Sequence, residues 1–85
     1  MPNRAGDWFS QALRDLEQAR DSKQAGRHEW ACFAAHQAAE KAVKALHLHR
    51  GQEAWAPFEH YGPLHSEEAI AYAGAIVEFV RRQMA

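Results

Sequence analysis

Residues 30–46 read WACFAAHQAAEKAVKAL and carry the clearest helical pattern in the sequence. Placed at 100° steps, its alanines and Leu46 cover roughly half of a helix circumference, with Cys32 and Val43 at one margin. So wide an apolar arc needs more than one neighbouring helix, and alanine lets those neighbours approach closely. The pattern predicts a central helix over about residues 29–50 that ends at Gly51.

A shorter apolar stripe at helical spacing occurs on each side of this segment. The stripes predict helices over about residues 7–25 and 66–84, built on Trp8, Ala12, Leu16 and Ala19 and on Ala69, Ala73, Ile76 and Val80. We expect Asp7 or Asn3 to cap the first helix and Ser66 to cap the last. Pro57, Gly62 and Pro63 predict a linker over residues 51–65, which is apolar enough to lie against the bundle.

No segment shows the alternation of a strand, so the predicted fold class is all-α, a small antiparallel bundle of three main helices. The 85 residues form one domain, 1–85, and one cysteine excludes an intrachain disulfide. A chain of this size buries only about 60–65% of its unfolded surface, so we expect dimerisation to complete the core. Trp30, Phe33 and Leu48 lie outside the main apolar arc and offer a second contact surface.

The net charge of −1 gives no general attraction to nucleic acid. No apolar run is long enough to cross a bilayer, and no signal-peptide pattern follows the first residues. We therefore expect a cytoplasmic protein with no membrane partner.

The central helix, with Gln37-Ala38-Ala39-Glu40-Lys41-Ala42 at its middle, resembles the signature helix of the HEPN domain family. The first helix, with a Trp near its start and then Leu13-Arg14-Asp15-Leu16, is similar to the family's opening helix, and residues 67–82 resemble its closing helix. The linker runs almost directly into the last helix, so the chain looks like a shortened member.

The resemblance implies an all-helical domain that forms homodimers. Many relatives are encoded beside a minimal nucleotidyltransferase and act as the toxin of a toxin–antitoxin pair. Active members are metal-independent ribonucleases that use an Arg, four to six residues and then a His, with two such motifs brought together by dimerisation.

That spacing does not occur here, because nine residues separate Arg50 from His60. A ribonuclease needs a His to move a proton and an Arg to stabilise phosphate charge. Arg50, His60 and His65 supply both types around the linker, so a folded linker that brings them together is the candidate catalytic site. The alternative is that these histidines only face solvent.

Lys41 and Lys44 share part of a helix face with Arg50 and are the candidate phosphate contacts, for RNA or a nucleotide. The alternative is a solvated charged face, since the chain has no glycine-rich phosphate loop. His47 lies about 10 Å along the axis from Glu40, too far to join Glu40 and His36 around one metal ion. We predict no metal and no cofactor.

Two hypotheses follow. We favour a catalytically silent interaction module that dimerises and binds a minimal nucleotidyltransferase in a toxin–antitoxin-type system, because the ribonuclease spacing is absent. The alternative is an enzyme, a metal-independent ribonuclease toxin with a rearranged site at Arg50, His60 and His65.

Overall fold

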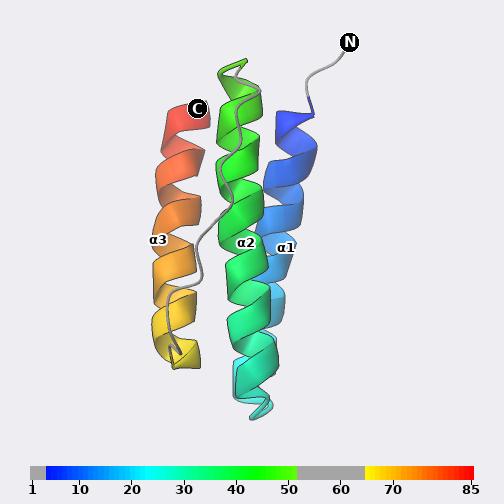
Figure 1. The fold of residues 1–85 in the computed structure, drawn as a ribbon, viewed down its shortest axis with the longest axis vertical. Helices are drawn as coiled ribbons and strands as arrows, with labels where there is room; N and C mark the ends of the chain where they lie inside the picture. The colour runs from blue at the N-terminus through cyan, green and yellow to red at the C-terminus, as the bar shows by residue number, and fades with distance from the viewer. Residues whose placement is uncertain (1–3, 52–64) are drawn as a thin grey trace.

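The computed structural model describes residues 4–51 and 65–85. This part of the chain forms three helices, α1 (Ala5–Gln24), α2 (His28–His49) and α3 (Ser66–Met84), and contains no strand. α2 lies between the other two helices (Figure 1). The all-α, three-helix prediction is confirmed, and each helix begins and ends within two residues of its predicted position.

Glycine ends the first two helices in the way the sequence indicates. Gly26 has a φ of +78° and Gly51 a φ of +72°, the left-handed conformation that glycine adopts without a Cβ penalty. At the end of α1 the Gly26 amide donates to the Lys23 carbonyl and the Arg27 amide to the Ser22 carbonyl. This pair of bonds is a Schellman motif, which satisfies carbonyls at the helix end.

The helix starts differ from the predicted caps. Arg4 stands at the start of α1 and makes no side-chain cap hydrogen bond, so Asp7 is not the cap, and Asn3 lies outside the described residues. His65 occupies the cap position of α3. The Ser66 side chain instead bonds to another helix, with its Oγ 2.8 Å from Nδ1 of His28.

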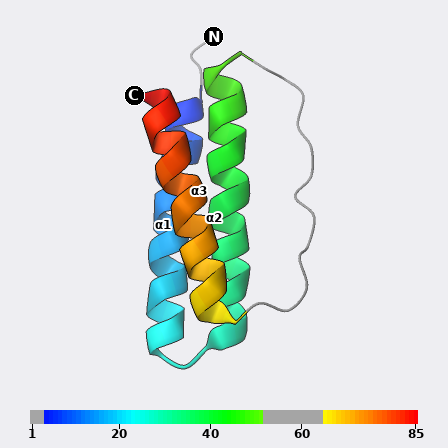
Figure 2. The same cartoon turned by 90° about the vertical axis from the view of Figure 1, so that its left-hand side faces the viewer.

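The helix directions show where the sequence expectation needs correction. α1 and α2 are antiparallel as predicted, whereas α3 runs parallel to α2 (Figures 1 and 2). His28 and Ser66 meet at the starts of α2 and α3, and Arg50 Nη2 donates to Gln83 Oε1 at their far ends, at 3.0 Å. Gly51 and His65 therefore lie at opposite ends of the bundle. Fourteen residue steps, which reach about 46 Å when extended, can join them.

Alanine dominates the core of the described residues. The α2 face that packs on α1 and α3 is buried and consists of Ala31, Ala34, Ala35, Ala38, Ala39, Ala42, Ala45 and Leu46. Leu16 of α1 and Val77 and Val80 of α3 are the larger buried side chains around it. Each alanine buries only one methyl, worth on the order of 0.8 kcal/mol, so the core depends on many close contacts between the helices rather than on one large side chain.

Two aromatic residues remain exposed on the opposite side of α2. Trp30 is 65% and Phe33 57% exposed, and their rings meet edge to face with centroids 6.1 Å apart. Leu48, predicted to lie with them, is half-buried. The second contact surface expected from the sequence thus has its aromatic part at the N-terminal half of α2.

Among the described helices, none combines the length and the apolar character that a membrane span requires.

We expect Ala38→Glu and Ala42→Glu each to destabilise the fold severely, by roughly 4 kcal/mol or more. Both alanines are fully buried, and either change leaves an unpaired carboxylate in the seam of α2. The measurement is chemical unfolding followed by circular dichroism. Ala75→Glu, at an exposed alanine of α3, is the matched control and should change stability by less than about 1 kcal/mol. Unchanged stability in both alanine variants would contradict the packing described.

Candidate functional site

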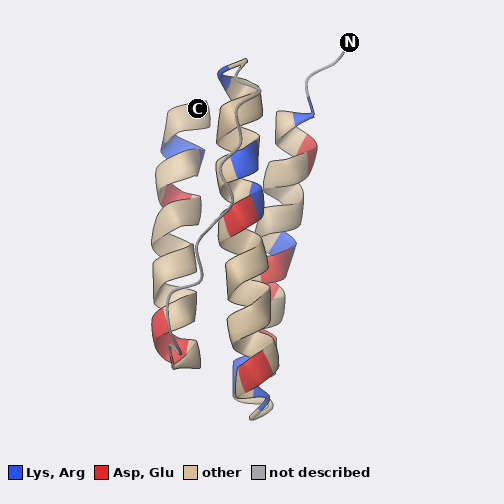
Figure 3. Ribbon diagram, in the orientation of Figure 1, with Lys and Arg blue, Asp and Glu red and all other residues tan. Residues whose placement is uncertain are grey.

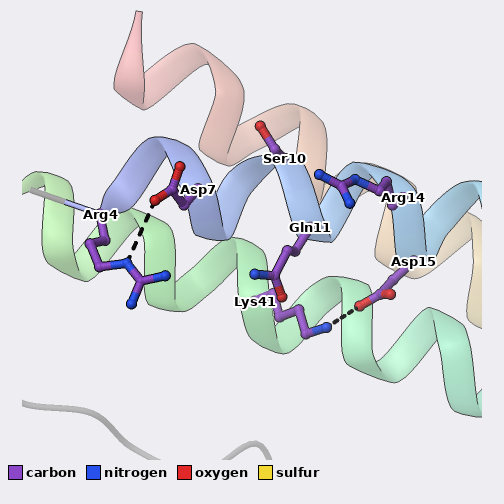
Figure 4. A pocket seen from close by; sticks show the side chains of 7 residues that line it. All are labelled: Arg4, Asp7, Ser10, Gln11, Arg14, Asp15 and Lys41. Carbon is purple, nitrogen blue, oxygen red and sulfur yellow. Dashed lines mark ion pairs between the residues drawn. The ribbon is translucent and has the colours of Figure 1, made fainter.

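A charged hollow lies in the groove between α1 and α2 (Figure 4). Its volume is about 430 Å³, and it is lined by Arg4, Asp7, Ser10, Gln11, Arg14, Asp15 and Lys41. Asp7, Gln11 and Asp15 recur at intervals of four and so follow one line along α1, with Ser10 and Arg14 at its outer margin. Figure 4 shows Gln11 and Lys41 inside the groove, while Ser10 and Arg14 project from the outer side of α1.

The shorter of the two ion pairs in the hollow joins the two helices. Lys41 Nζ lies 2.8 Å from Asp15 Oδ2, and both side chains are about three-quarters buried, with 24% and 25% exposed. The distance is that of a contact ion pair, although the geometry is not that of a hydrogen bond. By contrast, Arg4 and Asp7 form a 3.6 Å pair within α1, with side chains 71% and 69% exposed.

Lys44, the other predicted phosphate contact, lies over an aromatic ring rather than in the hollow. Its ammonium is 4.4 Å from the centroid of Trp8, a cation–π contact that again links α2 to α1. Lys41 and Lys44 therefore each have a partner within the chain, and a phosphate would have to compete with Asp15 for Lys41. Their role in phosphate binding stays a prediction.

The three predicted catalytic residues are not brought together by the described part of the chain. Arg50 lies at the far end of α2 with Gln83, whereas His65 precedes α3 at the other end of the bundle. The 19-residue α3 between these positions spans about 28 Å. His60 lies outside the described residues.

A second hollow, which sequence reasoning missed, lies where His65 is found. Its volume is about 420 Å³, and residues of all three helices or their ends line it: Lys23, His28, Glu29, Cys32, His65, Ser66 and Glu67. The His28–Ser66 contact crosses one side of it. His28 and Ser66 are 38 positions apart in the sequence. Their contact could have been predicted only by knowing that α3 runs parallel to α2.

Metal ligation finds no support in the described residues. Within 4–51 and 65–85, no three His, Cys, Asp or Glu side chains are arranged to hold an ion.

Charge is unevenly distributed along the bundle (Figure 3). Basic residues gather where α2 and α3 end: Lys44, Arg50, Arg81 and Arg82. At that end Arg81 Nε donates to Glu78 Oε2 at 2.9 Å, a second guanidinium nitrogen binds Oε1, and Arg82 lies 3.5 Å away. The hydrogen bond from Arg81, and then the positive charges of both arginines, lower the pKa of Glu78.

The Lys41–Asp15 pair should stabilise the α1–α2 contact. We expect Asp15→Asn to lower the free energy of unfolding by about 1 kcal/mol, because it leaves Lys41 without its counter-charge in a mostly buried position. Asp7→Asn, which breaks the exposed pair with Arg4, is the matched control and should cost no more than about 0.5 kcal/mol. Urea unfolding measures both. An equal effect of the two variants would show that burial does not strengthen the Lys41 pair.

The lowered pKa of Glu78 predicts a pH dependence of known sign. Because the folded-state pKa lies below the ordinary 4.5, the ion pair stabilises the fold above that pH, and this contribution disappears as the pH falls through the folded-state pKa. NMR titration should show the Glu78 pKa rising towards its ordinary value in Arg81→Gln. Since the Glu78 carboxylate is accessible to solvent, salt should weaken the effect. An unchanged pKa in the variant would contradict the assigned cause.

Comparison with known proteins identifies the family to which this arrangement of helices belongs. The sequence model of the HEPN domain matches residues 5–60, which contain α1 and α2. The crystal structure of TT1696 from Thermus thermophilus is 32% identical, with a TM-score of 0.82, and the match covers 96% of this chain and 99% of that one. ST0689, an archaeal HEPN homologue, is 29% identical with a TM-score of 0.84, over 99% and 100% of the two chains.

No curated protein matches the sequence. The matches to the two solved structures cover 96% and 99% of this chain, so the likeness extends through α3. Because the family model covers well over half of the residues, the chain belongs to the HEPN domain family.

Proposed function

We propose that the protein is a catalytically silent HEPN interaction module. It forms a homodimer and binds a minimal nucleotidyltransferase as its partner, in a toxin–antitoxin-type system. The protein acts by binding these partners through side chains on the helix surfaces, and it needs no metal or cofactor.

One observation carries the catalytically silent part of this proposal. Arg50 and His65 lie at opposite ends of the bundle, and acid–base chemistry needs its groups within hydrogen-bond reach of one substrate. Sequence spacing agrees, since no Arg is followed by a His after four to six residues. Within one chain Arg50 and His65 therefore cannot act on one substrate. A site shared between two chains, with Arg50 from one and His65 from the other, is the ribonuclease alternative that the RNA-cleavage experiment tests.

Binding to other chains is supported by what the described surface offers. Aromatic residues are the side chains that most often dominate protein interfaces, and here Trp30, Phe33 and Phe79 are each more than half exposed. The small alanine core provides little stability of its own, so association has a large relative effect on the fold.

RNA cleavage by the purified protein, with and without a chelator, tests the absence of catalysis. We expect no cleavage above that of an Arg50→Ala variant and of a His60→Ala, His65→Ala variant, with circular dichroism showing that all three proteins are folded. Chelator-resistant cleavage by the wild type that disappears in both variants would overturn the proposal and establish the ribonuclease alternative.

The partner is tested by co-expression with a nucleotidyltransferase encoded beside the gene. We expect the two proteins to co-purify in a complex of defined stoichiometry by light scattering. A folded dimer that gives no complex with that protein would contradict the partner assignment while leaving dimerisation intact.

A further inference from the structure

We propose that a second copy of the chain docks antiparallel along the outer side of α2, with Trp30 and Phe33 of each copy against the C-terminal half of α2 in the other. This inference rests on the proposed dimerisation and adds the surface, the direction and the register.

The outer side of α2 carries a seven-residue repeat that the core does not use. Trp30, Gln37 and Lys44 occupy one position of the repeat, and Phe33, Glu40 and His47 occupy the other. All six are exposed or half-buried, whereas the alanines that contact α1 and α3 face the opposite way. Residues at these intervals lie on one stripe of a helix and can therefore face one partner helix, and Trp30 and Phe33 are the apolar members of this stripe.

Antiparallel packing pairs one position of this repeat with the other. In the register that places Phe33 beside the partner copy's Lys44, Trp30 meets His47 and Gln37 meets Glu40, and the two-fold axis repeats every pair. Lys44 already lies over the Trp8 ring, so Phe33 would add a second aromatic group beside the same ammonium. The amide of Gln37 can donate to the Glu40 carboxylate.

The uneven charge favours this direction over a parallel one. Lys44, Arg50, Arg81 and Arg82 lie towards one end of the bundle with Glu78 among them, and Glu29, Glu67 and Glu68 lie at the other with Lys23 and Arg27 among them (Figure 3). A parallel copy would set the basic ends side by side. An antiparallel copy sets the basic end of each chain beside the acidic end of the other, which is the complementary arrangement.

The dimensions of the bundle favour a lengthwise contact over stacking end to end. The molecule measures 41 × 22 × 19 Å. A stable interface buries about 800 Å² on each partner, which a lengthwise face can supply, whereas an end offers about half of that. Trp30 and Phe33 place the most exposed aromatic area of α2 on such a lengthwise face.

Disulfide cross-linking tests the register directly. Phe33→Cys and Lys44→Cys are made separately in a Cys32→Ser background and then mixed and oxidised. We expect a cross-link between the two different variants and little within either alone, because equivalent Phe33 positions lie about 16 Å apart along the axis, beyond disulfide reach. Ala71→Cys, on the exposed side of α3, is the control and should not cross-link with either.

The oligomeric state separates failure of the inference from failure of the proposed function. Light scattering of the wild type should show a dimer, with Trp30→Ala raising its dissociation constant at least tenfold. Glu40→Gln should lower it, because the change removes the repulsion between two Glu40 carboxylates near the two-fold axis and keeps an amide oxygen that accepts from Gln37. A monomeric wild type would overturn dimerisation itself. A dimer that cross-links through Phe33 alone, or through Ala71, would overturn this interface and leave the proposed function standing.

Discussion

Close contact along the alanine face of α2 is the constraint on which the rest of the structure depends. With eight buried residues on that face, seven of them alanine, α1 and α3 can both approach one helix. The three helices keep this close contact only while no larger or charged side chain lies between them, since a well-packed interior has little room to relax. Every polar contact between helices described above forms around this seam and adds to it.

The small size of the core residues also explains where the aromatic side chains lie. Because alanine fills the centre, the large aromatic side chains are free to lie at the margins of the helices, where Trp8 receives Lys44 and Trp30 meets Phe33. Small proteins with modest cores gain relatively more from association than large ones. A HEPN domain of this size is thus suited to a role in which binding and stability are coupled.

Because α3 runs parallel to α2, residues that are far apart in the sequence meet at each end of the bundle. It places His65 beside His28 and Ser66, and moves it to the end opposite Arg50. It also brings the C-terminal ends of α2 and α3 together, so their basic last turns face the negative ends of two helix dipoles at once. The concentration of positive charge at one end follows from direction as much as from composition.

The three helices, the alanine face and the exposed Trp30 and Phe33 were predictable from the sequence, because helical periodicity is a local property read from residues a few positions apart. The direction of α3 was not predictable, since a segment as long as residues 51–65 can reach either end of the bundle before α3 begins. The Lys41–Asp15 pair, the Lys44–Trp8 contact and the His28–Ser66 bond were equally out of reach. Each joins residues at least 26 positions apart, and such partners are chosen by how the helices pack, which local pattern does not encode.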